Sequence, residues 1–113
     1  MSPKARAAAA HFRAHERRRV ALSATLRDGR GAFSWRVRVR DLGLGGAGIE
    51  LDQPIDGGHE VVLEIVAPSL WDPLVVRGDV AWAQGERAGV RFAFEDPSLL
   101  FALFEVLAAE GFE

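Results

Sequence analysis

Cysteine is absent from the 113 residues of this chain. Its absence excludes disulfide frameworks, thiolate zinc sites and cysteine nucleophiles, and it fits a protein of the reducing cytoplasm. Long apolar runs are also absent: no stretch approaches the roughly 20 residues that cross a bilayer, and the N-terminus lacks the apolar centre of a secretory signal. We therefore expect a cytoplasmic protein without membrane insertion.

Residues with catalytic potential are scarce. The three histidines show no convincing metal-ligand spacing, because His11 and His15 could hold a metal only if their segment were helical. None of the five serines lies in a nucleophile elbow or a phosphate-binding loop. The sequence therefore predicts neither an enzyme nor a metal or cofactor site.

The composition that remains is that of an ordinary globular domain, with 49% hydrophobic and 27% charged residues. A chain of this length forms one well-cored domain rather than two. The net charge of −2 conceals an asymmetry, since residues 1–40 contain eleven basic and two acidic residues, and residues 41–113 contain three and fourteen. This asymmetry favours an anionic partner near the N-terminus and argues against nucleic-acid binding by the whole surface. Mutual attraction of the two halves within the fold is the alternative.

Alternation of apolar and polar residues is the main structural signal. Residues 1–19 lack it and are interpreted as a basic N-terminal arm, whereas a strand is predicted from Val20 onward. The clearest strand covers residues 33–39, with an apolar face for the core and an arginine-rich face for solvent. Residues 41–46 include three glycines, so we expect a tight loop with backbone angles that a strand interior does not use.

Further short strands follow, and the chain ends in a predicted helix. Asp96 is a candidate cap and Pro97 suits the first helical position. The helix should pack Leu100, Phe104 and Leu107 or their neighbours on the sheet, leaving part of its apolar surface for a partner or a homodimer. Six strands with short connections predict an all-β dominated, antiparallel barrel or sandwich. The predicted strands are residues 20–26, 33–39, 47–51, 60–66, 75–82 and 89–94.

One combination of residues indicates a ligand. An arginine cluster at residues 17–19 precedes the first strand, and Asp41 opens the glycine-rich turn after the second. A guanidinium can bind phosphate through two hydrogen bonds or stack on a purine, and a carboxylate can accept from the donors of a guanine edge. The combination suits a guanine nucleotide, although arginine clusters and glycine turns are usually only solvated faces and turns.

The same segments resemble a known family. Residues 20–22, 40–49, 77–82 and 88–92, in this order behind an arginine-rich segment, resemble the PilZ domain. The resemblance spans about residues 13–108. It implies a six-stranded antiparallel β-barrel with a C-terminal α-helix over residues 20–113, preceded by the arm. It also implies a receptor for the bacterial second messenger cyclic di-GMP.

The ligand motifs of PilZ domains are Arg-x-x-x-Arg in the arm and Asp/Asn-x-Ser-x-x-Gly after the second strand. Asp41 and Gly46 match the second motif, with Gly43 at the serine position. The first motif fits Arg13 and Arg17, whereas counting back from the first strand places His15 and Arg19 in the two arginine positions. The binding residues that the resemblance implies are Arg13, Arg17, Arg18, Arg19, Asp41, Gly43 and Gly46.

Three hypotheses follow. The leading one is a single-domain cyclic di-GMP receptor that passes its signal to an unidentified effector protein. The second is a degenerate PilZ domain that binds no nucleotide and acts as a protein-interaction module, an interpretation that Gly43 favours. The third, a nucleic-acid binder using the basic strand of residues 36–40, is disfavoured because Trp35 falls on the opposite face from those arginines.

Overall fold

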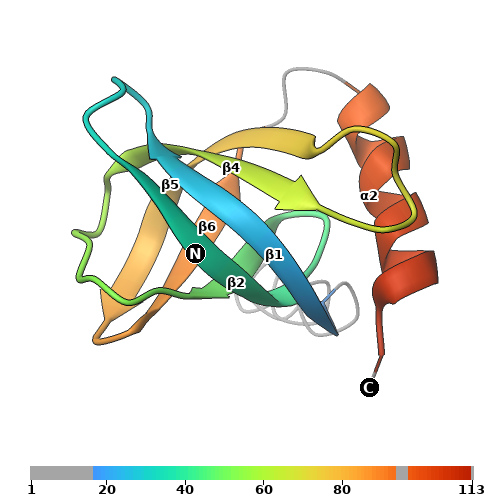
Figure 1. The fold of residues 1–113 in the computed structure, drawn as a ribbon, viewed down its shortest axis with the longest axis horizontal. Coiled ribbons are helices and arrows are strands. Elements are labelled where there is room, and N and C mark those ends of the chain that lie inside the picture. Colours follow the sequence, from blue (N-terminus) through green and yellow to red (C-terminus); the bar gives the residue numbers. More distant parts are fainter. Residues whose placement is uncertain (1–16, 94–96, 113) are drawn as a thin grey trace, which may run out of the picture.

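The alternating segments form six strands in a computed structural model, which describes residues 17–93 and 97–112. The strands pair only with antiparallel neighbours and close into a barrel in the order β1-β2-β3-β6-β5-β4, followed by one helix, α2 (Figure 1). The predicted β-barrel with a C-terminal helix is therefore confirmed. The elements are β1 (Arg18–Asp28), β2 (Ser34–Leu42), β3 (Gly46–Glu50), β4 (Glu60–Val66), β5 (Leu74–Gln84), β6 (Arg87–Phe92) and α2 (Ser98–Glu110).

The barrel core follows from the period of two along each strand. In β2, Val37 and Val39 are buried, while Arg36, Arg38 and Arg40 face solvent. Leucine, isoleucine and valine from all six strands fill the interior, and the removal of this apolar surface from water is the main stabilising contribution. The face assignment of this strand is thus confirmed for its C-terminal half, while Phe33 and Trp35 are only partly buried and stack on each other.

The bounds of five strands differ from the prediction by one to three residues, and two of these differences lie near Asp41. β1 begins at Arg18, two residues before the apolar alternation starts, because Arg18 and Arg19 pair with Leu42 and Asp41 of β2. The glycine loop is shorter than expected and comprises only residues 43–45 between β2 and β3. Apolar alternation reports burial, whereas backbone pairing can continue where no side chain is buried.

The helix α2 lies beside the barrel, near the start of β1 and the connection between β4 and β5 (Figure 1). Leu103, Val106 and Leu107 are its buried residues. The expected packing is confirmed for Leu107 and wrong for Phe104, which is 55% exposed while its neighbour Leu103 is buried. Phe101 and Phe104 are the apolar surface left over. The proposed cap, Asp96, lies outside the described residues. No helix in the described ranges has the length and apolar character needed to span a membrane.

Candidate functional site

Arg17 and Asp41 form an ion pair at the end of the barrel where β1 begins. The Arg17 Nη1 donates to Asp41 Oδ1 at 2.7 Å, and the same oxygen accepts the backbone N–H of Gly48 at 3.2 Å. Both side chains are about one-third exposed, at 34% for Arg17 and 37% for Asp41. A carboxylate and a guanidinium are therefore held together within reach of solvent, and each can form hydrogen bonds with a ligand.

Gly48 provides the space that Asp41 occupies. A Cβ at position 48 would lie 2.8 Å from Asp41 Cγ and closer still to Oδ2, so any side chain there would displace the carboxylate. Gly46 is close-packed for a different reason, because its Cβ would collide with the backbone oxygen of Val90 in β6. The expected tight loop is present at residues 43–45, but it forms without positive φ: among the described residues, positive φ occurs only at the turn glycines 31, 58 and 85.

The register of four strands extends this arrangement into a row. Asp41 in β2 pairs with Gly48 in β3, Gly48 pairs with Gly89 in β6, and Gly89 pairs with Trp82 in β5. Strands lie about 4.8 Å apart, so the row spans about 14 Å. A Cβ at Gly89 would lie 2.7 Å from Trp82 Cε2, so the indole lies over this glycine, and it remains 46% exposed. We call Asp41, Gly48, Gly89 and Trp82 the glycine row.

In the glycine row, the Asp41 carboxylate covers Gly48 at one end and the Trp82 indole covers Gly89 at the other. Sequence reasoning missed Gly48, Gly89 and Trp82. The signal that could have found the two glycines is their position inside predicted strands, where glycine often marks the close approach of another group. The exposure of Trp82 could not be predicted, because apolar alternation with Val80 places the tryptophan in the core. The irregular pairing between Val80 and Trp82 turns it outward.

Of the other predicted binding residues, Gly43 and Gly46 lie near the ion pair, whereas Arg18 does not. Gly46 lies beside the ion pair, with its Cβ position 3.3 Å from Arg17 Nη2, and Gly43 donates its N–H to the Gly46 carbonyl at 2.9 Å. Arg18 instead packs against the end of α2, since a Cβ at Gly111 would lie 2.9 Å from its Cδ. Arg13, like the pair His11 and His15, lies outside the described residues.

Arg19 connects the site to the C-terminus through its backbone. Its N–H donates to the Phe112 carbonyl at 3.1 Å, and the Phe112 N–H donates back to the Arg19 carbonyl at 2.8 Å. Arg19 also pairs with Asp41 across β1 and β2. The segment that follows Arg17 is thus bonded on one side to the strand of the candidate site and on the other to the residues that follow α2.

The sequence matches the PilZ domain family over residues 11–105. The chain belongs to the PilZ domain family. Solved structures of 13–17% identity share its fold. No curated protein matches the sequence.

Two solved PilZ domains superpose over most of the chain. The PilZ domain of CeSA from a cellulose-synthesizing bacterium has a TM-score of 0.70 at 17% identity, over 81% of this chain and 95% of that one. The PilZ domain of YcgR from Escherichia coli, solved with cyclic di-GMP, has a TM-score of 0.69 at 16% identity, over 83% and 87%. The inhibitor of motility MotI from Bacillus subtilis has a TM-score of 0.60 at 13% identity, over 78% and 46%.

Charged groups elsewhere on this PilZ domain form separate clusters. The Glu50 carboxylate in β3 forms ion pairs with three arginines, at nitrogen–oxygen distances of 3.3 to 3.7 Å. These arginines are Arg38, Arg40 and Arg87, and the cluster flanks the glycine row. In the described residues, no group of three or more His, Asp or Glu side chains is arranged to hold a metal. The basic face of β2 is therefore partly neutralised by its neighbours, whereas the Asp41 carboxylate, paired with Arg17, lies over Gly48.

At the far end of β1, Asp28 forms a structural cluster of its own. Its side chain is 8% exposed, accepts the Ala32 N–H at 2.9 Å and contacts His59 Nε2 at 2.5 Å. The Ala32 N–H, followed by the bond to His59, lowers the pKa of the Asp28 carboxyl from its ordinary value. Since Arg17 and Asp28 flank opposite ends of β1, this cluster belongs to the β1–β2 hairpin and not to the candidate site.

Proposed function

We propose that this PilZ domain is a cytoplasmic receptor for cyclic di-GMP that passes the signal to a separate partner protein. The observation that carries the proposal is the ion pair of Arg17 and Asp41 beside the glycine row. The guanine edge offers N–H donors that suit the Asp41 carboxylate, and the two phosphates suit arginine. Trp82 offers an exposed ring on which a base can stack.

Binding replaces one set of contacts by an equivalent set. In the pair, Arg17 satisfies Asp41, and each is about one-third exposed and therefore screened by solvent. When the ligand enters, guanine takes over the carboxylate and phosphate takes over the guanidinium, so both protein charges stay compensated. An exposed pair is easily exchanged in this way, whereas a buried pair would resist separation.

The remaining arginines of the motif region complete the proposal. Arg18 and Arg19 are exposed at the start of β1, and with Arg13 they add positive charge for the second phosphate. Because Arg19 is hydrogen bonded to Phe112, movement of this segment on binding also reaches the chain after α2. The exposed Phe101 and Phe104 of α2 are then the surface on which a partner would sense the ligand.

A second candidate function is a PilZ domain that binds no nucleotide and acts as a protein-interaction module. Two observations favour it. Gly43 takes the place of the motif serine, so one ligand contact is missing, and Asp41 already has two donors in Arg17 and the Gly48 N–H. In this alternative, the ion pair of Arg17 and Asp41 has only a structural role and holds the start of β1 against β2.

Isothermal titration with cyclic di-GMP tests the receptor proposal, with Arg17→Ala as the informative variant. Arg30→Ala is the matched control: it removes the same charge from an exposed residue of the β1–β2 turn, beyond the opposite end of β1. We expect Arg17→Ala to weaken binding at least tenfold and Arg30→Ala to change it less than threefold. Equal losses in both variants would contradict a specific site, and absence of binding by the unmodified protein would favour the interaction module.

A further inference from the structure

Arg91 in β6 lies next to the candidate site, although neither ligand motif includes it. The strand register pairs it with Gly46 of β3. Directly opposed residues of antiparallel strands have their Cβ positions about 5 Å apart. A Cβ at Gly46 would lie 3.3 Å from Arg17 Nη2, so Arg17 and Arg91 both adjoin Gly46, which has no side chain and is buried.

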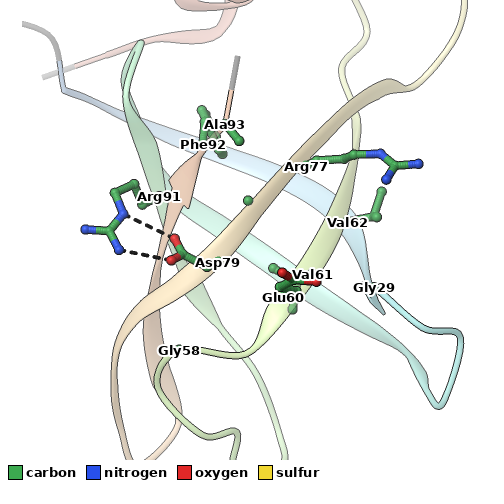
Figure 2. Close-up of a pocket in the computed structure, with 11 residues that line it drawn as sticks. Gly29, Gly58, Glu60, Val61, Val62, Arg77, Asp79, Arg91, Phe92 and Ala93 are labelled. Atoms are coloured by element: carbon green, nitrogen blue, oxygen red, sulfur yellow. Dashed lines mark hydrogen bonds and ion pairs between the residues drawn. The ribbon is translucent and has the colours of Figure 1, made fainter. Parts of the chain in front are cut away.

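The guanidinium of Arg91 is held along one edge. Its Nε and Nη2 donate to the two carboxylate oxygens of Asp79 at 3.2 and 2.9 Å, and Figure 2 shows this carboxylate directed toward Arg91. These bonds raise the pKa of Arg91 and lower that of Asp79, so both stay charged at neutral pH. Two of the five N–H donors are used, and within residues 17–93 and 97–112 the other three meet no acceptor.

Space and solvent surround this pair. The Arg91 side chain is 67% exposed, and a cavity of about 490 Å³ opens beside it (Figure 2). Glu60 and Arg77 line the same cavity on the far side of Asp79. The cavity lies on the β4 and β5 side of Arg91, and Gly46 does not line it. A phosphate beside Arg91 could meet its unoccupied donors without breaking its bonds to Asp79.

We propose that Arg91 is a further phosphate-binding residue of the nucleotide site and that Asp79 is its positioning residue; this rests on the cyclic di-GMP function proposed above. When Asp41 binds the guanine, a phosphate of the same nucleotide can reach Gly46, two residues before Gly48 in β3, where Arg17 and Arg91 are both close by. A charge-assisted bond from Arg91 is stronger than the hydroxyl contact that Gly43 cannot make. Arg91 thus compensates for the missing serine of the motif.

Arg87 provides a matched control. It lies on the same face of the same strand, and its side chain is also 67% exposed and paired with a carboxylate. The difference is that Arg87 is opposed by Glu50, which also receives Arg38 and Arg40. Any loss of binding caused only by removing one positive charge from this face would be equal in the Arg87 and Arg91 variants.

The experiment is titration of Arg91→Ala and Arg87→Ala with cyclic di-GMP at several salt concentrations. We expect Arg91→Ala to weaken binding at least tenfold and to reduce the number of salt ions released on binding by about one. We expect Arg87→Ala to change the affinity less than threefold. Arg91→Lys, which keeps the charge but lacks the planar fork, should fall between them. Equal effects at both positions, or an unchanged affinity in Arg91→Ala, would overturn the role of Arg91 while leaving the receptor function intact. Absence of binding by the unmodified protein would instead overturn the receptor function itself.

A double-mutant cycle tests the role of Asp79. If Asp79 acts by positioning Arg91, Asp79→Ala weakens binding in the unmodified background and has no effect once Arg91 is alanine. A loss in both backgrounds would show that Asp79 acts independently of Arg91. A gain of affinity in Asp79→Ala would show that the carboxylate competes with phosphate. Either result would overturn the positioning role.

Discussion

Gly46 and Gly48 lie two residues apart on the same face of β3, yet alanine should affect them in opposite ways. At position 48 the added Cβ meets the side chain of Asp41, which can rotate away into solvent. At position 46 it meets the backbone oxygen of Val90, which belongs to the strand paired with β3 and cannot move alone. We predict that Gly48→Ala removes ligand binding and preserves the fold, and that Gly46→Ala destabilises the fold.

The magnitudes follow from the contacts. Gly48→Ala loses a hydrogen bond of about 1 kcal/mol and a screened ion pair of about 0.5 kcal/mol. The lower entropy of the unfolded alanine chain offsets about 0.5 kcal/mol of this loss. Gly46→Ala introduces overpacking that costs about 1–3 kcal/mol or more. For 113 residues, 1 kcal/mol corresponds to about 4 °C in Tm, so we expect decreases of about 4 °C for Gly48→Ala and up to about 12 °C for Gly46→Ala.

Thermal unfolding followed by circular dichroism gives the Tm values, and isothermal titration with cyclic di-GMP gives affinity at a temperature where both variants are folded. Gly48→Ala should weaken binding at least tenfold because Asp41 leaves its position. The reasoning is refuted if Gly48→Ala binds with unchanged affinity, or if it lowers the Tm more than Gly46→Ala does.

Three further predictions concern the motif, the acid limit of stability and the helix. Gly43→Ser should strengthen cyclic di-GMP binding about twofold to tenfold by titration, because one hydrogen bond is gained and the φ of Gly43 is not positive; unchanged affinity would contradict a ligand role for position 43. Because the folded-state pKa of Asp28 lies below its ordinary value of 3.8, its contribution to stability is present above about pH 4 and lost as the pH falls through the lowered folded-state pKa. Asp28→Asn should therefore flatten the acid side of the profile of Tm against pH, and an unchanged profile would rule out this linkage. Leu103→Ala should lower the free energy of unfolding by about 2–5 kcal/mol in urea, because Leu103 is fully buried, whereas the exposed Phe104 should tolerate alanine with less than about 1 kcal/mol of loss; similar losses would contradict the observed helix orientation.

Much of the fold could be predicted from local patterns. The alternation in residues 33–39 indicated which face of β2 carries arginine, since a period of two is a property of the single strand. The turn between β1 and β2 contains Gly31, which has a positive φ of 84°. Local patterns were less reliable at strand ends: Asp41 and Gly46 lie in strands rather than in the predicted loop, because pairing with Arg19 and Arg91 extends β2 and β3.

The sequence by itself determined the barrel strands, the acidic and basic halves, and the Asp41, Gly43 and Gly46 match to a PilZ motif. Only the tertiary structure decided what surrounds Asp41. Pairing of β3 with β6, which are far apart in the chain, placed Gly48 against Gly89 and brought Trp82 and Arg91 to the same face. Such neighbours are set by strand register, which depends on how the whole barrel closes, and no local periodicity contains that information.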